Sequence, residues 1–546
     1  MRKVILEALR KVTDKSEIEL EFPELSAYGD YSTNVALVLS NEKGTNPKIL
    51  AGKIADKVRA DASLKEYISK IEVAGPGFIN FFLSEKALLD ELVSIEKQQE
   101  KYGTSDLGRG KTVIVDYSSP NIAKRFGIGH LRSTVIGQSL YNLYRFLGYK
   151  VIGDNHLGDW GTQFGTLLYQ IDSKGLNASE LTIDELEKLY VEFNSEAQEN
   201  EKLWDMARAW FKKLEEKDAR AREIWKKVVD TSLKEFERIY NILGVKIDYA
   251  YGESFYVDKM PAVITEVREK GLAKKSEGAE IMEFKGLPPA MLVKSDGTTT
   301  YFTRDLATVK FRIEEWDPKL IIYEVGSDQT LHLRQLFEAA RLLGWVKDRD
   351  FVHVNHGLIR FIHGKMSTRK GDTIKLEDVI SEAIARARKI KDDVQIATAV
   401  GIGAVKYFDL MHHPSTDIIF DWEKIFILEG NSAPYLQYTV ARANSVLEKG
   451  RKSPPKGKIA LNLEELGILR SLIRFSEIIV IAAKSYSPNL LANYLFDLAQ
   501  KFNNFYSQHR IIEGENEELR LVLTSGVVQV LKNGLTILGI DTPERM

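Results

Sequence analysis

The residues from 118 to 134 constrain the fold more than any other segment, because they join a short apolar run to a long amphipathic one. Residues 112–115 are typical of a buried strand, and residues 135–147 have the spacing of a helix. Between them, Gly127-Ile128-Gly129-His130 lies where the helix begins. Unpaired backbone N–H groups at a helix N-terminus favour phosphate, and glycine allows a nucleotide to approach the backbone closely. The pattern predicts a nucleotide-binding strand–loop–helix unit, although an ordinary turn between a strand and a helix has the same local signature.

A second, later segment suits the same kind of ligand. Gly364-Lys365-Met366-Ser367-Thr368-Arg369-Lys370-Gly371-Asp372 is a basic loop bounded by glycines, and helix-like sequence follows from Leu376. Cations on a short loop can offset the charge that a polyphosphate gains in a transition state. The other interpretation is a solvated basic loop, which is the usual meaning of such a run.

Together the two segments resemble the paired ATP signatures of class I aminoacyl-tRNA synthetases, HIGH and KMSKS. The residues Ser118-Ser119-Pro120-Asn121-Ile122-Ala123-Lys124, which precede Gly129-His130-Leu131-Arg132-Ser133-Thr134, are similar to arginyl-tRNA synthetases in particular. Further motifs of that family follow in the same order: Asp159-Trp160-Gly161-Thr162-Gln163-Phe164-Gly165, Tyr301-Phe302-Thr303-Arg304-Asp305 and Asn431-Ser432-Ala433-Pro434-Tyr435-Leu436-Gln437-Tyr438. The resemblance extends from about residue 25 to the last residue, and several motifs in order are more specific than any one.

The predicted fold is α/β, with a Rossmann-type nucleotide-binding parallel sheet. Strand-like and helix-like runs alternate from residue 111 to about 395, and every strong pattern after about 396 is helical. We expect strands at 112–116, 151–154, 320–325 and 351–356, and two more at 71–74 and 78–83 around a Gly-Pro-Gly turn. The expected domains are an α+β tRNA D-loop-binding domain over 1–108, a catalytic domain over 109–395 with a helical insertion at about 175–245, and an all-α anticodon-binding domain over 396–546.

The resemblance implies an arginine–tRNA ligase. Such an enzyme activates L-arginine with ATP to arginyl-adenylate and pyrophosphate, then transfers arginine to the terminal adenosine of tRNA(Arg). The implied first step depends on bound tRNA, and ATP arrives as its Mg²⁺ complex. Positioning and charge stabilisation should dominate such chemistry. The expected protein is a cytoplasmic monomer with no structural metal of its own.

By family position, His130 stabilises the ATP phosphates, and Gly127 and Gly129 lie against the nucleotide. The resemblance implies ATP contacts for Lys365, Met366 and Ser367 of the later segment. It also implies a catalytic role for Lys365.

The chain departs from the family pattern at three positions of these signatures. Gly127 stands where the family usually has its first histidine, Arg125 replaces a proline, and Thr368 replaces a second lysine. In arginyl enzymes that lack this lysine, the lysine of the Asn-Ile-Ala-Lys motif substitutes for it. In this chain that catalytic role falls on Lys124. The alternative interpretation is that Lys124 is an ordinary surface lysine.

A guanidinium is a planar fork of hydrogen-bond donors that keeps its proton, so a pocket selective for it should offer fixed acceptors. The family's arginine contacts fall on Asp116, Asn121, Tyr301, Asp305 and Gln329. Asp116 holds a position that is commonly glutamate, and its shorter side chain weakens the case for a direct contact. The alternative for Asp305 is that it caps a helix beginning at Leu306.

An aromatic and basic face is the best local signal for RNA. Tyr435, Tyr438 and Arg442 recur at i, i+3 and i+7, which places them on one face of a helix where they can stack on an unpaired base. The alternative is a core stripe. The resemblance implies tRNA contacts for these three residues and for Phe78, Asn80 and Met546, with a core role equally open for Phe78.

Composition excludes several classes of protein. Among the 546 residues there is no cysteine, so neither a disulfide nor a thiolate zinc site can form. The net charge of −2 gives no global signal for nucleic acid, and no apolar run approaches the ~18 residues that a membrane span needs. The spacing of the histidine pairs at 353 and 356 and at 412 and 413 matches no zinc pattern. Two other functions stay open: a class I synthetase for another amino acid, and a non-catalytic tRNA-binding relative, which Gly127 favours.

Overall fold

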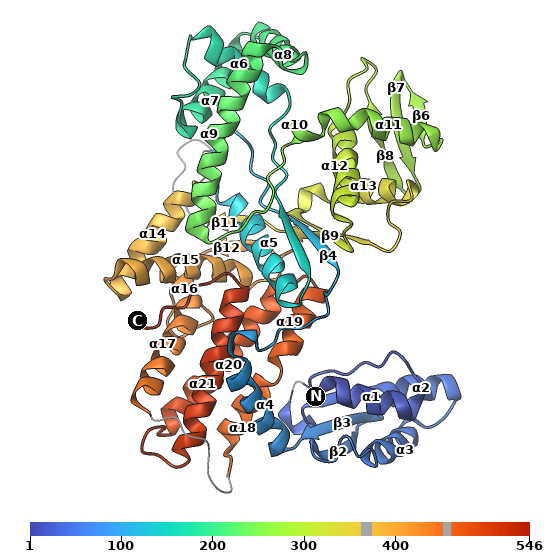
Figure 1. Cartoon of the computed structure of the whole chain (residues 1–546), viewed down its shortest axis with the longest axis vertical. Coiled ribbons are helices and arrows are strands. Elements are labelled where there is room, and N and C mark those ends of the chain that lie inside the picture. The colour runs from blue at the N-terminus through green and yellow to red at the C-terminus, as the bar shows by residue number, and fades with distance from the viewer. Residues whose placement is uncertain (24, 362–373, 451–459) are drawn as a thin grey trace. The chain divides into compact units, whose positions relative to one another are not determined.

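The computed structural model describes the chain except residues 24, 362–373 and 451–459 (Figure 1). It divides into two compact units. One unit comprises residues 1–102, 442–477 and 497–533, and the other comprises 103–441, 478–496 and 534–546. The domain boundaries expected from the sequence stay a prediction. No helix among the described residues is both long and apolar enough to cross a membrane.

The larger unit is built on a parallel sheet whose four strands match the four expected ones. They are β4 (Thr112–Asp116), β5 (Lys150–Asp154), β9 (Leu320–Gly326) and β10 (Asp350–His356), in the order β10-β9-β4-β5. The Val and Ile residues of β4, and Ile321 and Ile322 of β9, are buried, as expected for a sheet covered on both faces. The chain leaves β4 towards β5 on one side and later returns as β9 on the other. The C-terminal ends of β4 and β9 therefore flank a topological switch point, the usual place for a ligand in such sheets.

Two helices that follow the sheet strands frame this switch point. Helix α5 (Gly129–Phe146) connects β4 to β5, and α13 (Thr330–Leu342) connects β9 to β10. Helix α12 (Tyr301–Trp316) precedes β9 and packs with α13 in one hydrophobic core that contains Leu306, Ile321 and Leu336. This shared core holds α12 and α13 together beside β9.

Helices fill the range expected for the insertion: α7 (Ile183–Glu199), α8 (Lys202–Glu215) and α9 (Ala219–Leu243). A further helix, α6 (Thr162–Ser173), precedes that range. Asp218 accepts hydrogen bonds at the N-terminus of α9, and left-handed Gly244 ends it. The Trp225 indole N–H donates to the carbonyl of Asp159 over 2.9 Å, which ties α9 to the loop after β5.

A small antiparallel sheet follows this insertion, and the sequence reading missed it. Its strands are β6 (Ala273–Ser276), β7 (Ala279–Phe284) and β8 (Leu287–Val293), joined to α9 by α10 (Glu253–Tyr256) and α11 (Met260–Glu269). Its apolar residues Met282 and Leu292 are buried in the core that α12 and α13 share.

The later part of the larger unit begins with α14 (Leu376–Ile390) and α15 (Val394–Leu410). Strands β11 (Ile359–Phe361) and β12 (Ile418–Phe420) form a short parallel pair, so the region after 396 is not purely helical. It continues with α16 (Trp422–Ile425), and four longer helices contribute residues to both units: α17 (Ala433–Lys449), α19 (Phe475–Lys484), α20 (Pro488–Gln508) and α21 (Glu517–Ile537).

The smaller unit contains the expected α+β arrangement. Strands β1 (Tyr31–Thr33), β2 (Ile68–Ala74) and β3 (Phe78–Leu83) form an antiparallel sheet in the order β1-β3-β2. The Gly-Pro-Gly turn joins β2 to β3, and Gly75 and Gly77 both have positive φ. Its helices are α1 (Arg2–Thr13), α2 (Val35–Lys43), α3 (Pro47–Arg59), α4 (Glu85–Gln98) and α18 (Leu463–Leu472).

Candidate active site

Hydroxyl side chains hold the loop between β4 and α5 against the sheet. Ser118 and Ser119 both have positive φ, a conformation that costs free energy in non-glycine residues and needs support from its surroundings. The Ser118 N–H donates to Ser133 Oγ over 2.9 Å, and Ser133 Oγ donates to the carbonyl of Glu324 on β9 over 2.8 Å. Thr134 Oγ1 donates to the carbonyl of His130 over 2.6 Å. The Ser-Thr pair of the first signature therefore fixes the start of α5 to the sheet.

His130 lies at the start of α5 with one ring nitrogen already bonded. The Gly127 N–H donates to His130 Nδ1 over 3.1 Å, so a neutral ring carries its proton on Nε2. Burial lowers the pKa of His130, and the nearby charge of Lys124 acts in the same direction. The neighbouring Gly129 is exposed, and a Cβ there would meet no atom within 4 Å. The start of α5 therefore offers a neutral imidazole donor beside open backbone, which suits a phosphate-bearing ligand.

The segment that follows the basic loop pairs with this turn. Gly127 forms an antiparallel bridge with Lys375, and the Leu376 N–H donates to the carbonyl of Phe126 over 2.9 Å. Lys365, Met366, Ser367 and Thr368 lie outside the described residues. The residues that follow the second signature thus pair with the turn of the first one.

The two cations before the turn face the helical insertion. The Lys124 ammonium lies 4.9 Å from the centre of the Tyr190 ring on α7, a cation–π contact. Arg125 forms an ion pair with Asp184 at the start of the same helix. Arg125 is therefore occupied by Asp184, and a catalytic role for Lys124 stays a prediction.

A cavity of about 220 Å³ lies at the switch point, where β4 and β9 end. Three of the five predicted arginine-binding residues line it: Asp116, Asp305 and Gln329. Tyr301 is exposed, and its ring lies 4.9 Å from that of His332, which also lines the cavity. Asn121 is exposed and pairs through its backbone with Gly158.

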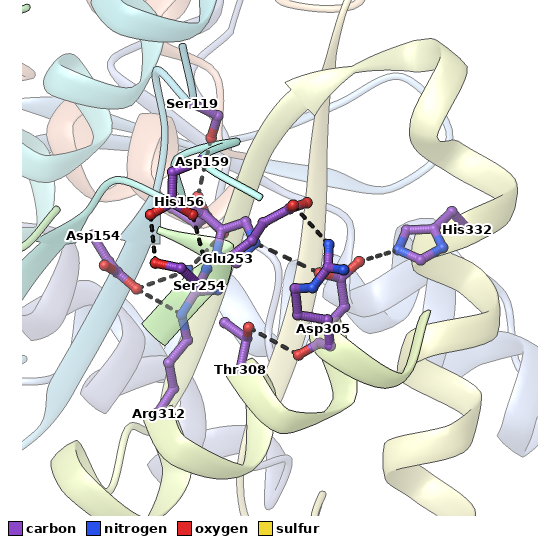
Figure 2. Close-up of polar contacts among 12 residues, drawn as sticks. Ser119, Asp154, His156, Asp159, Glu253, Ser254, Asp305, Thr308, Arg312 and His332 are labelled. Atoms are coloured by element: carbon purple, nitrogen blue, oxygen red, sulfur yellow. Dashed lines mark hydrogen bonds and ion pairs between the residues drawn. The ribbon is translucent and has the colours of Figure 1, made fainter. Parts of the chain in front are cut away.

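A buried guanidinium of the chain itself forms one wall of the cavity (Figure 2). Arg312 is fully buried, and its Nη2 lies 2.8 Å from Asp116 Oδ2 and 2.7 Å from Asp154 Oδ2. Burial raises the pKa of Asp154, whereas Arg312 opposes this shift. One oxygen of Asp116 is therefore committed to Arg312. Arg312 is a site residue that the sequence reading missed, although it lies two turns after Asp305 on α12.

Asp305 is flanked by two histidines, which the sequence reading also missed. Its Oδ2 lies 2.5 Å from His332 Nε2 on α13, and its Oδ1 lies 3.7 Å from His156 Nε2 on the loop after β5 (Figure 2). Helix α12 begins at Tyr301 with Thr300 at its N-cap position, so the alternative that Asp305 caps a helix is wrong. The Asp305 carboxylate faces the cavity from inside a helix, as a substrate-binding group would.

The loop after β5 is held against α10 by a second acidic group. Asp159 accepts hydrogen bonds from the Ser254 N–H over 2.8 Å and from the Ser254 hydroxyl over 2.5 Å. A Cβ on Gly252 would come within 2.1 Å of the Asp159 carboxylate, so this position requires glycine. Next to it, Glu253 accepts from Arg304 Nη1 over 2.6 Å. Asp159 of the Asp-Trp-Gly motif thus holds the loop that carries His156 against α10.

The predicted anticodon residues lie on α17. Tyr438 is exposed, Arg442 is half-buried with its guanidinium 5.3 Å from the centre of the Tyr506 ring, and Tyr435 packs edge-on against Phe496. The face is therefore not a uniform core stripe.

The remaining predicted tRNA residues have different environments. Phe78 is exposed at the start of β3, which excludes a core role, whereas Asn80 is buried and accepts a hydrogen bond from Ser32 Oγ over 2.7 Å. Met546 packs against a cluster formed by α14 and α15. Gln437 donates to the carbonyl of Asp541 over 2.7 Å and so holds the C-terminal tail to α17.

Three family models match consecutive parts of the chain. The model described as "tRNA synthetases class I (R), catalytic domain" matches residues 91–422. The "Arginyl tRNA synthetase N terminal domain" matches residues 1–83, and the "DALR anticodon binding domain" matches residues 436–546.

Whole-chain comparisons agree with these models. A protein of Clostridium botulinum named arginine–tRNA ligase is 39% identical over 98% of this chain and 97% of its own, and one of Halothermothrix orenii is 40% identical over 97% and 96%. The solved arginyl-tRNA synthetase of Plasmodium falciparum superposes with a TM-score of 0.82 at 25% identity, covering 100% of this chain and 98% of its own. The fold is also that of the Thermus thermophilus enzyme, with a TM-score of 0.86 at 22% identity over 100% and 99% of the two chains. The chain therefore belongs to the arginyl-tRNA synthetase family of class I aminoacyl-tRNA synthetases.

Proposed function

We propose that the chain is an arginine–tRNA ligase that forms arginyl-adenylate from L-arginine and ATP and then charges tRNA(Arg). The observation that carries this proposal is the carboxylate of Asp305, which faces a 220 Å³ cavity at the switch point of the sheet. A cavity of that volume suits one amino acid, and a fixed carboxylate in it favours a cationic side chain.

On the arginine side, Asp305 binds the guanidinium, and Tyr301 and Gln329 complete its surroundings. Among the described residues, Asp116 Oδ1 has one weak contact, with Ser119 Oγ at 3.5 Å, and we propose that this oxygen accepts from the substrate. Asn121 keeps its proposed substrate contact by family position. Fixed acceptors favour arginine over uncharged amino acids because the guanidinium brings both a charge and a matching donor geometry.

On the ATP side, His130 donates from Nε2 to a phosphate oxygen, and Gly129 leaves the backbone open to the nucleotide. Gly127 is buried and keeps its proposed nucleotide contact by family position, while its N–H orients His130. Lys124 and Lys365 supply positive charge where negative charge grows on the departing pyrophosphate, and Met366 and Ser367 complete the nucleotide contacts. ATP enters as its Mg²⁺ complex. Such donors act mainly in the transition state, so they should govern kcat.

The proposed tRNA contacts are Tyr435, Tyr438, Arg442 and Met546 for the anticodon and Phe78 and Asn80 for the D-loop. Tyr438 and Phe78 have exposed rings and are the better supported of these contacts. We propose that amino-acid activation requires bound tRNA and that the enzyme acts as a cytoplasmic monomer.

The decisive experiment is ATP–pyrophosphate exchange with each amino acid, with and without tRNA(Arg). An arginine–tRNA ligase gives exchange with arginine alone among the amino acids, and only when tRNA is present. Exchange with another amino acid identifies a different class I synthetase. Tight tRNA binding without any exchange or charging identifies a non-catalytic relative.

A further inference from the structure

Two imidazoles flank the Asp305 carboxylate. His332 comes from α13, and its Nε2 lies 2.5 Å from Asp305 Oδ2. His156 comes from the loop after β5, and its Nε2 lies 3.7 Å from Asp305 Oδ1. Both imidazoles line the same cavity as Asp305 and are largely buried.

Apart from its 3.7 Å approach to Asp305, the His156 ring makes no close polar contact in the described part of the chain. Among the described residues, neither of its ring nitrogens has a hydrogen-bond partner, although both are buried. Its ring packs 5.6 Å from that of Tyr256, and the charges near it are those of Asp305, Asp154, Asp159 and the pair Glu253–Arg304. Buried polar groups in folded proteins normally have hydrogen-bond partners, and a ligand in the cavity would provide a partner for this ring.

The other carboxylates near the cavity are already matched by groups of the chain. Asp116 and Asp154 share Arg312, Glu253 pairs with Arg304, and Asp159 accepts from Ser254. Asp305 differs from them because both of its neighbours are titratable. His332 also contacts the rings of Tyr301 and Phe302, which carry no charge. Whether Asp305 presents a net negative charge to the cavity therefore depends on the two histidines.

We propose that His156 and His332 are positioning residues that leave Asp305 available to a cationic substrate only while both imidazoles are uncharged. A neutral His332 donates one hydrogen bond to Oδ2 and fixes the carboxylate, and Oδ1 then accepts from the guanidinium. Protonated imidazoles neutralise Asp305 and repel a third cation at short range. This inference rests on arginine being the substrate. It adds that arginine binding is linked to the deprotonation of this pair.

The test compares three variants of the full-length enzyme with the wild type. His332→Gln keeps an amide donor near the position of Nε2 but cannot become charged, whereas His332→Leu removes the donor. His413→Gln is the matched control, because His413 is exposed and lies outside the site. The KM for arginine and kcat are measured by pyrophosphate exchange at saturating tRNA from pH 5.5 to 8.5. Direct calorimetry of arginine binding in buffers of different ionisation enthalpy counts the protons released.

We expect wild-type affinity for arginine to fall at least tenfold from pH 7.5 to 5.5, with proton release on binding at the acid end. His332→Gln should match the wild type within about threefold at pH 8 and lose most of that pH dependence. His332→Leu should raise the KM at every pH, and His413→Gln should leave the profile unchanged. Citrulline, whose ureido group is uncharged, should not lose affinity as the pH falls.

The inference is overturned if His332→Gln keeps the wild-type slope, or if His332→Leu binds arginine as well as the wild type does. If His332→Gln fails to fold, His156→Gln provides the same comparison of slopes. Failure of the proposed function gives a different result, because the wild type would then not activate arginine at any pH.

Discussion

The backbone N–H of Ile128 donates a hydrogen bond of 2.9 Å to the carbonyl oxygen of Ile374. Ile128 belongs to the turn that presents His130, and Ile374 follows the basic loop that contains Lys365. This bond and the bridge between Gly127 and Lys375 join two segments that are far apart in the sequence. The residues that follow the second signature are therefore held against the turn of the first, a pairing that the separate sequence signatures could only suggest.

The first prediction concerns the ring nitrogen that His130 presents. Because Nδ1 accepts from Gly127, Nε2 should be the donor to phosphate. His130→Asn, which lacks a donor at that position, should lower kcat for arginine activation by about 10²- to 10³-fold with little change in KM. His130→Gln should retain more activity, since its amide reaches further. Near wild-type activation by the Asn variant would show that His130 does not contact phosphate.

The lowered pKa of His130 predicts that the stability of the folded chain depends on pH. Burial lowers the pKa of His130, so the neutral ring persists below the usual histidine range. In the unfolded chain this group binds a proton at a higher pH, so its contribution to stability is present at neutral pH and is lost on acidification. His130→Gln should therefore reduce the dependence of the urea midpoint on pH between about 4 and 7. An unchanged slope would contradict a lowered pKa.

The second residue to test is Lys124. If its charge replaces the lysine absent at Thr368, Lys124→Met should depress pyrophosphate exchange at least tenfold while preserving the length of the side chain. Tyr190→Leu is the control, because it removes only the ring beneath the ammonium. Equal losses in both variants would mean that Lys124 serves only to pack the insertion. Thr368→Lys in the Lys124→Met background should restore part of the rate.

The sequence predicted the elements whose patterns are local. The four parallel strands and the start of α5 could be placed because buried Val and Ile runs and the glycine-rich turn are visible in one dimension. The antiparallel strands β6 to β8 were missed because Lys274, Lys275 and the two prolines in β8 obscure their alternation. Their stability comes from the core that Met282 and Leu292 share with α12 and α13.

The site was predicted in part for a related reason. Asp116, Asp305 and Gln329 could be found because family motifs mark them, and the structure brings them to one cavity. Arg312, His156 and His332 could not, because what makes them important is their distance to those carboxylates across different helices. Sequence spacing carries no information about which carboxylate a buried cation neutralises.

The third prediction separates binding from stability at Asp305. Asp305→Asn should raise the KM for arginine at least tenfold, because a charge-assisted hydrogen bond is worth about 1.5–3 kcal/mol. The unfolding midpoint should change little, since Asp305 does not cap α12. Glu314→Gln on the exposed side of the same helix is the control and should alter neither quantity. A loss of stability without a change in KM would assign Asp305 a purely structural role.

The fourth prediction concerns the buried cation of the site. Arg312→Leu leaves Asp116 and Asp154 buried without their cation, a change that typically costs about 3–5 kcal/mol. The denaturation midpoint of the Arg312→Leu variant should therefore be lower than that of the wild type at pH 8. Because the unpaired carboxyls are less costly once protonated, the deficit should shrink as the pH is lowered towards 5. A deficit that does not depend on pH would show that packing, rather than charge, accounts for the loss.

The last prediction tests the face of α17. Tyr438 is exposed, so Tyr438→Ala should remove a stacking contact worth about 1–3 kcal/mol without disturbing the core. We expect the KM for tRNA to rise about tenfold for Tyr438→Ala and for Arg442→Ala, with the KM for arginine and ATP unchanged at saturating tRNA. Leu463→Ala, at another exposed apolar position, is the control. Charging of transcripts altered at the central anticodon base should improve relative to wild-type tRNA in both variants. If both still reject these transcripts as strongly as the unaltered enzyme does, the surface that reads the anticodon does not include this face of α17.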